Sequence, residues 1–220
     1  MPVRVGLRFI ESWKSDLEKA VCKYETETED QAPKGQIVFY GPSYYTRWCA
    51  DFGMKPLREA LPGKSGAPCC INRGFGSSCS EHQLYYYPRM VRPFEPKVLV
   101  YASHANGASF GYSQEEIWEI AQRVIMYTLT DFPDCRVYIV GAHPTKNMSD
   151  AERERKKLYD SWIIEFAEKT PNCSYINLLD HEPFCDPSVF LDDGVHFNRK
   201  GYDLCEEFYK EVLKDELEKF

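Results

Sequence analysis

Long apolar runs are missing from this sequence of 220 residues. The longest, residues 97–102 and 137–142, are far shorter than the ~20 residues that a membrane-spanning helix needs, so no such helix is expected. Residues 1–19 carry a charge every few positions and never build the unbroken apolar core of a secretory signal. We therefore expect a cytoplasmic protein.

Basic tracts are missing as well. The chain has 27 Lys and Arg against 34 Asp and Glu, which gives a net charge of −7. A protein that binds a phosphate backbone needs clustered cations, and this sequence has no such cluster. Nucleic acid is therefore not expected as a partner.

A disulfide framework is also absent. The nine cysteines are odd in number and have no framework spacing, so we expect reduced thiols. Cys69, Cys70 and Cys79 lie close together in the sequence, but a zinc site would need a C-x2-C pair and a fourth ligand. We expect no metal.

The N-terminal region has an amphipathic pattern. Apolar residues recur at helical spacing from about residue 5 to 24, at Ile10, Trp13, Leu17, Val21 and Tyr24. Such a stripe predicts a helix that packs on the rest of the chain or on a second copy, which leaves a homodimer open. The acidic, polar stretch that follows predicts a linker. We expect two parts, residues 1–35 and residues 36–220.

After the linker, short β-rich runs alternate with helical patterns. Two helices are predicted by S-x-x-E capping boxes, at Ser113 with Glu116 and at Ser149 with Glu152, and a last helix begins near Asn198. The predicted strands are residues 37–40, 70–72, 98–101, 137–140 and 175–178. Strands separated by helices indicate a parallel sheet covered on both faces, so we expect a flavodoxin-like, three-layer α/β/α sandwich with five parallel strands.

The loops after the strands are where such sheets hold their sites. The first strand is followed by Gly41-Pro42-Ser43, which presents a hydroxyl at the rim of the sheet. Ser43 has two interpretations: a cap of the following helix, since serine is a preferred N-cap, or a nucleophile. A nucleophile needs a base.

A base is available in the sequence from Asp193 to His196. An Asp three residues before a His, on a loop with a glycine, can orient the imidazole through one ring nitrogen and leave the other for a hydroxyl. Two alternatives stay open. The Asp and His are simply solvated, or Asp192, Asp193 and His196 form a metal site with His181, although this spacing matches no known pattern.

Four segments of the chain, IVFYGPSYYTRW, INRGFGSS, VLVYASHANG and DGVHFNRKGY, occur in this order between residues 36 and about 209. Together they resemble the SGNH hydrolases, also called the GDSL lipase and acylhydrolase family. The second segment is close to the N-R-G-F-G-G-S of one bacterial branch, and the last is similar to the family's D-G-x-H-x-N-x-x-G-Y.

The resemblance implies that Ser43 is the nucleophile, His196 the general base and Asp193 its orienting partner. In the family, three groups hold the oxyanion: the nucleophile's N–H, a second-block glycine N–H and a third-block asparagine side chain. Here Ser77 replaces that glycine, and Asn106 comes one place after the expected position.

Two further departures from the family pattern bear on these roles. Pro42 replaces the Asp of G-D-S, which is not a triad member. Ala105 stands where the asparagine is expected, so the third oxyanion donor is either supplied by Asn106 or lost. His104 and His143, in loops after predicted strands, are pocket candidates.

The resemblance implies a serine esterase that cleaves small acyl esters without a metal or organic cofactor. The bacterial branch adds an acetylated carbohydrate as a candidate substrate. The alternative is a catalytically impaired protein of the same fold that binds a ligand or partner. A nucleotide-binding role is disfavoured, because the loop after the first strand holds one glycine and bulky neighbours.

Overall fold

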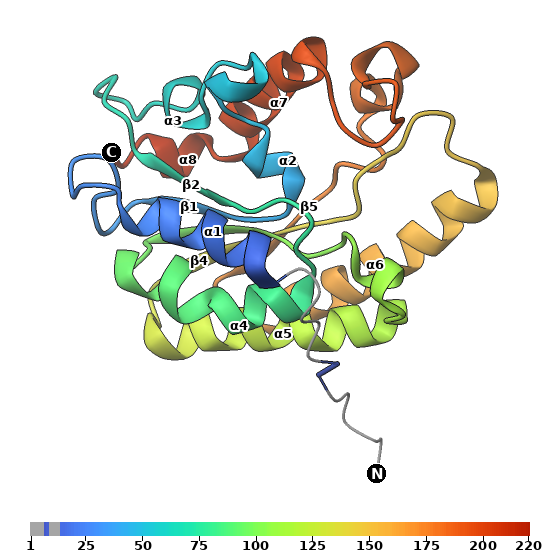
Figure 1. Cartoon of the computed structure of the whole chain (residues 1–220), viewed down its shortest axis with the longest axis horizontal. Coiled ribbons are helices and arrows are strands. Elements are labelled where there is room, and N and C mark those ends of the chain that lie inside the picture. The colour runs from blue at the N-terminus through green and yellow to red at the C-terminus, as the bar shows by residue number, and fades with distance from the viewer. Residues whose placement is uncertain (1–6, 9–13) are drawn as a thin grey trace.

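A computed structural model describes residues 7–8 and 14–220 of the chain. Its centre is a five-stranded parallel sheet with the strand order β2-β1-β3-β4-β5, covered by helices on both faces (Figure 1). The predicted three-layer α/β/α fold with five parallel strands is therefore confirmed.

The strands are short and almost entirely buried, as expected for a parallel sheet with two covered faces. Four of them begin within one residue of the predicted positions: β1 Ile37–Gly41, β2 Cys70–Gly74, β3 Val98–Ala102 and β4 Arg136–Val140. The fifth, β5 Cys173–Ile176, begins and ends two residues before its predicted range. Its pairing with β4 stops at Ile176, because Asn177 then turns the chain and accepts a hydrogen bond from the backbone N–H of Asp180.

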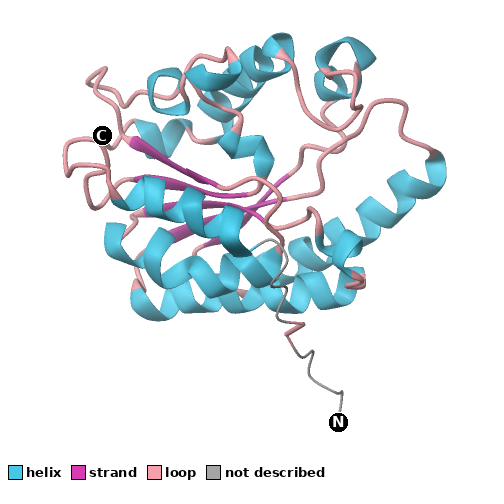
Figure 2. Ribbon diagram, viewed as in Figure 1, coloured by secondary structure: helices cyan, strands magenta, loops and turns pink. Residues whose placement is uncertain are grey.

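One face of the sheet is covered by α1 Lys14–Glu25, α4 Ser80–Met90, α5 Gln114–Asp131 and α6 Asp150–Lys169 (Figure 2). The predicted capping box at the start of α5 is present: Ser113 and Glu116 each accept a hydrogen bond from the other's backbone N–H. At α6, Ser149 caps the backbone of Glu152, while the Glu152 side chain binds Lys156 and Thr145 instead of closing the box.

The other face is covered by α2 Ser43–Thr46, α3 Leu57–Ala60, α7 Arg199–Val212 and α8 Lys214–Leu217. Asn198 caps α7, as its predicted position near the helix start implies. Short 3-10 turns occupy the connections, at Ala50–Phe52, Arg92–Phe94, Gly107–Phe110, Glu182–Cys185 and Pro187–Val189.

The N-terminal helix packs on the domain itself. Leu17 and Val21 of α1 are buried in the core on the α4 side, while Ile10 and Trp13, which the sequence placed on the same stripe, lie outside the described residues. Arg89 of α4 fixes the helix further, with ion pairs to Glu18 and Glu25. Within the described residues, no helix is both long and apolar enough to cross a membrane. The division at residue 35 stays a prediction.

The strand order places the site. From β1 the chain moves outward to β2 and then crosses back over β1 to form β3, so the loops after β1 and β3 diverge at the carboxyl edge. This reversal of direction is where open α/β sheets leave a crevice for ligands.

Candidate functional site

Ser43 is held at the rim of the sheet by a tight turn. A Cβ at Gly41 would lie 2.9 Å from the carbonyl oxygen of Ala102, so only glycine lets β1 pass this close to β3. Pro42 occupies the cap position of α2, and no side chain caps that helix. Ser43 is the first helical residue, so the N-cap interpretation of its hydroxyl does not apply.

The loop from Asp193 to His196 is fixed by its own backbone. The carbonyl oxygen of His196 accepts a hydrogen bond from Leu191, and Gly194 turns the chain with a φ of 71°. One oxygen of Asp193 accepts hydrogen bonds from the backbone N–H groups of Val195 and His196, both at 2.9 Å. Such a loop holds the carboxylate beside the imidazole.

The three predicted side chains form one hydrogen-bonded series. Nδ1 of His196 lies 2.8 Å from Oδ2 of Asp193, and Nε2 of the same ring lies 2.8 Å from Oγ of Ser43. Partial burial raises the pKa of Asp193, but hydrogen bonds from the backbone and ring of His196 and from the Val195 N–H outweigh it and hold the pKa at about 2. The carboxylate is therefore charged at neutral pH and favours a proton on Nδ1.

The turn after β2 lies beside the Ser43 hydroxyl. A Cβ built on Gly76 would be 4.0 Å from Cβ of Ser43, and the next residue, Ser77, has a left-handed φ of 62°. This is the conformation that glycine favours, and glycine is the residue that the family pattern has here. Within the described part of the chain, no hydrogen bond occupies the backbone N–H of Ser43 or of Ser77. Two donors are thus free near the hydroxyl.

The third candidate donor lies in the loop after β3. Asn106 has a left-handed φ of 58°, and its Nδ2 donates a hydrogen bond to the carbonyl oxygen of Ser78 at 2.8 Å. The loop is pinned by Gly107, where a Cβ would come within 2.5 Å of Ile117. Asn106 therefore joins the β3 loop to the β2 turn, and its amide keeps a second N–H for a ligand.

His104 and His143, the two pocket candidates, are both held neutral. His104 borders a cavity of about 220 Å³ with Asn106 and Lys156, and burial together with the charge of Lys156 lowers the pKa of His104 to about 4. His143 is only 5% exposed, and burial also lowers its pKa well below the usual value. Its ring stacks on Tyr44 with centroids 3.5 Å apart and planes inclined by 4°. His143 thus packs against the ring of Tyr44, the residue next to Ser43.

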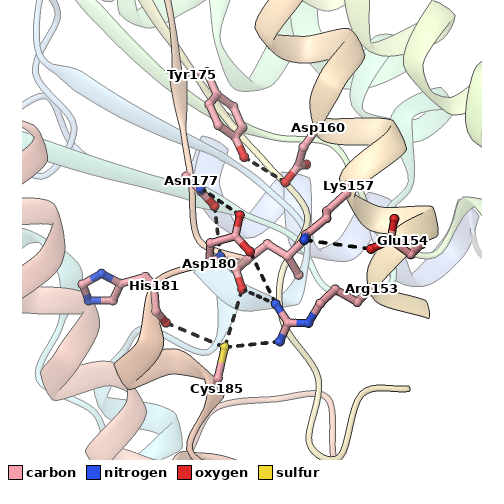
Figure 3. Close-up of polar contacts among 10 residues, drawn as sticks. Arg153, Glu154, Lys157, Asp160, Tyr175, Asn177, Asp180, His181 and Cys185 are labelled. Carbon is pink, nitrogen blue, oxygen red and sulfur yellow. Dashed lines mark hydrogen bonds and ion pairs between the residues drawn. The ribbon is translucent and has the colours of Figure 1, made fainter. Parts of the chain in front are cut away.

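The metal interpretation of the C-terminal loop does not fit the geometry. His181 contacts the rings of Phe184 and Phe208, and in Figure 3 its imidazole points away from the polar group of Arg153, Asp180 and Cys185. The described residues contain no group of three or more His, Cys, Asp or Glu side chains that could hold a metal ion.

Tyr44 and Asn72 are site neighbours that the sequence did not single out. Tyr44 is buried between His143 and the loop of His196. Asn72 belongs to the segment INRGFGSS, but only its hydrogen bond to Tyr45 of α2 shows that it positions the site. A contact of this kind leaves no periodic pattern in the sequence.

No protein-family model matches the sequence, and none of the curated proteins matches it significantly. The structure is similar to that of a lipase/acylhydrolase from Enterococcus faecalis, with a TM-score of 0.65 and 20% identity over 83% of this chain and 96% of that one.

Two further solved structures are similar over nearly their whole length. A GDSL-like lipase from Bacteroides thetaiotaomicron has a TM-score of 0.61 and 16% identity over 93% of this chain and 98% of that one. A family 3 carbohydrate esterase from Clostridium thermocellum has a TM-score of 0.61 and 13% identity over 84% and 97%. The chain therefore has the fold of the SGNH hydrolases, the GDSL-like lipase and acylhydrolase family that its sequence motifs resemble.

Proposed function

We propose that this chain is a serine esterase that cleaves small acyl esters through an acyl-enzyme intermediate. The observation that carries the proposal is the position of the His196 ring, 2.8 Å from the Ser43 hydroxyl on one side and 2.8 Å from the Asp193 carboxylate on the other. This is the arrangement of nucleophile, base and orienting group that acyl transfer requires.

In the first half of the reaction, Nε2 of His196 accepts the Ser43 proton as Oγ attacks the ester carbonyl. The negative oxygen that forms is held by the N–H groups of Ser43 and Ser77, with Asn106 as the proposed third donor. Nε2 then gives its proton to the leaving alcohol. Asp193 stays ionised and stabilises the imidazolium while it exists.

In the second half, water replaces the alcohol. Nε2 takes a proton from the water, the resulting hydroxide attacks the acyl carbonyl, and the proton returns to Oγ as the acid departs. Each step uses only side chains and backbone groups of this chain.

An acetylated carbohydrate is the substrate that we place first within this class. The similarity to a carbohydrate esterase supports it. So do the polar side chains of Gln114, His104 and Lys156, which border the cavity of about 220 Å³ beside Asn106. A neutral imidazole and an amide each offer a donor and an acceptor, which suits hydroxyl groups.

Ala105 favours a second candidate function. Alanine offers no side-chain donor where the family pattern has asparagine, so a protein that binds an ester or a partner with little turnover is the alternative. A missing donor costs about 10²- to 10³-fold in rate.

Labelling with a fluorophosphonate probe, followed by peptide mapping, tests the proposal. We expect the adduct on Ser43, no adduct in Ser43→Ala and full labelling of Ser161→Ala, which changes an exposed serine on α6. Hydrolysis of p-nitrophenyl acetate should fall about 10⁴-fold or more in Ser43→Ala and in His196→Ala, and the double variant should be little worse than either. Wild-type protein without an adduct would support the binding function instead.

A further inference from the structure

Strand β2 ends in Asn72, Arg73 and Gly74, directly before the turn that holds Ser77. These three residues contact both the helix that begins at Ser43 and the N-terminal segment.

Asn72 joins β2 to α2. Its Nδ2 donates a hydrogen bond to the carbonyl oxygen of Tyr45 at 2.7 Å, and its Oδ1 accepts one from the backbone N–H of Gly74 at 2.8 Å. The Asn72 amide therefore fixes the distance between α2, the nucleophile helix, and the end of β2. The turn with Ser77 begins at this strand end.

Gly74 lies directly against that helix. A Cβ at this position would be 2.2 Å from the backbone nitrogen of Thr46, so no other residue fits without moving α2. In addition, the hydroxyl of Tyr24 in α1 donates a hydrogen bond to the carbonyl oxygen of Gly74 at 2.6 Å. The peptide at Gly74 is thus held between the nucleophile helix and α1.

Arg73 connects the same strand end to the N-terminal segment. Its side chain is 1% exposed, and its Nη2 lies 2.8 Å from Oε2 of Glu27, at an angle outside hydrogen-bond geometry, so the contact is an ion pair. The guanidinium also lies over the rings of Tyr24 and Phe94, 4.8 and 4.2 Å from their centroids. A buried cation is costly unless it is paired, so Glu27 is needed to keep Arg73 in place.

We propose that Tyr24 and Glu27, in the N-terminal segment, are positioning residues for the catalytic centre: they hold Arg73 and Gly74, and Asn72 carries this support to the nucleophile helix. The inference rests on the proposed role of Ser43. Their proposed effect is on the position of Ser43 and not on the substrate. They act by keeping the Ser43 hydroxyl and the Ser77 N–H at the separation that attack on a carbonyl requires, where a displacement of about 1 Å costs about 10²-fold in rate.

The contacts separate this role from simple packing. Leu17 and Val21 bury α1 in the core cluster of this face, to which Ser43 does not belong, and so they account for the attachment of α1 without any link to Ser43. The Tyr24 hydroxyl adds little buried surface but bonds the peptide that abuts Thr46. Removing this hydroxyl alone should leave the fold intact and alter the centre.

The test is the rate of fluorophosphonate labelling at Ser43, measured together with the fraction of protein finally labelled. Tyr24→Phe keeps the ring over Arg73 and removes one hydrogen bond, so we expect the rate per labelled site to fall about 3- to 10-fold. Asn72→Asp replaces the donor by an oxygen that faces the Tyr45 carbonyl, and we expect a fall of about 10- to 100-fold. In both variants kcat for ester hydrolysis should fall by similar factors with KM nearly unchanged.

Two matched controls make the same chemical changes elsewhere. Tyr127→Phe removes the hydroxyl of an exposed tyrosine on α5. Asn172→Asp replaces an amide that donates to the carbonyl oxygen of Pro133, just before β5 begins and at the end of the sheet opposite the site. Both controls should be labelled at the wild-type rate.

Each outcome decides the inference. Slower labelling to the same final fraction in Tyr24→Phe and Asn72→Asp supports it. If both variants are labelled on Ser43 at the wild-type rate, the inference is overturned and the proposed function stays intact. The same holds if only the final labelled fraction falls, because that would mean a purely structural role for these residues. Wild-type protein that carries no adduct on Ser43 overturns the proposed function, and the inference fails with it.

Discussion

Replacing Asp193 by asparagine tests the proposed triad most sharply, because the structure assigns the two carboxylate oxygens different partners. Oδ1 accepts the backbone N–H groups of Val195 and His196, and Oδ2 faces Nδ1 of the His196 ring. In Asp193→Asn, the amide oxygen can keep both backbone bonds. The NH₂ group must then face the imidazole.

That exchange reverses the tautomer of His196. An amide NH₂ can only donate, so Nδ1 of His196 must accept, and the ring proton moves to Nε2. Nε2 then points its proton at Ser43, 2.8 Å away, and can no longer accept one. We expect kcat for p-nitrophenyl acetate to fall about 10⁴-fold, as the same change does in the serine protease triad, which serves here as the reference magnitude.

Stability should change little, because the backbone bonds that shape the loop survive. The lost ion pair is partly exposed, with side-chain exposure of 19% for His196 and 44% for Asp193, and such pairs contribute about 1 kcal/mol or less. A thermal melt of Asp193→Asn within a few degrees of wild type is therefore the control. A well-folded Asp193→Asn protein with wild-type kcat would refute the triad. If Ser43→Ala were equally active, the measured hydrolysis would come from elsewhere on the protein.

Three further predictions concern the oxyanion donors and one buried carboxyl. Asn106→Ala should lower kcat about 10²-fold with little change in KM if this amide is the third donor, and an unchanged rate would exclude it. Ser77→Gly should keep kcat within about twofold, because the backbone N–H stays and glycine favours the φ of 62°, whereas Ser77→Val should lose both activity and stability. Burial raises the pKa of Asp160 to about 6 despite hydrogen bonds from the Ala142 N–H and the Tyr175 hydroxyl, the second of which Figure 3 shows. A raised carboxyl pKa stabilises the fold at low pH, and this contribution is lost as the pH rises through about 6. The unfolding free energy of wild type relative to Asp160→Asn should therefore fall by roughly 2 kcal/mol between pH 4 and 7 in urea titrations, and a constant difference would contradict this.

Much of the fold could be predicted because it depends on local patterns. Strands such as β3 are fully buried apolar runs, and the Ser113 cap is a signature four residues long, so each is visible in a short window. The shift of β5 shows the limit. Its residues Cys173, Ser174 and Tyr175 are only partly buried at the sheet edge, so the apolar pattern is weak where the strand begins.

The candidate site also has a part that the sequence could predict and a part that it could not. Ser43, Asp193 and His196 could be named because each lies in a short motif whose residue types fit one chemistry. The bond from Tyr24 to Gly74 spans 50 residues and uses a backbone acceptor that any sequence offers. The stacking of His143 on Tyr44 likewise joins two loops that are adjacent only in the folded sheet. Such contacts follow from the topology, which must be known first.

The departures from the family pattern differ in what they change. Pro42 lies outside the hydrogen-bonded series, and Ser77 still offers its backbone N–H, so neither removes a donor or a proton carrier. Only Ala105 removes a hydrogen-bond donor that the family pattern has. A missing donor costs about 10²- to 10³-fold, whereas loss of a nucleophile or base costs on the order of 10⁶-fold in a serine protease. Because Ser43, His196 and Asp193 lie within hydrogen-bonding distance in series, we expect measurable ester hydrolysis even if Asn106 supplies no donor.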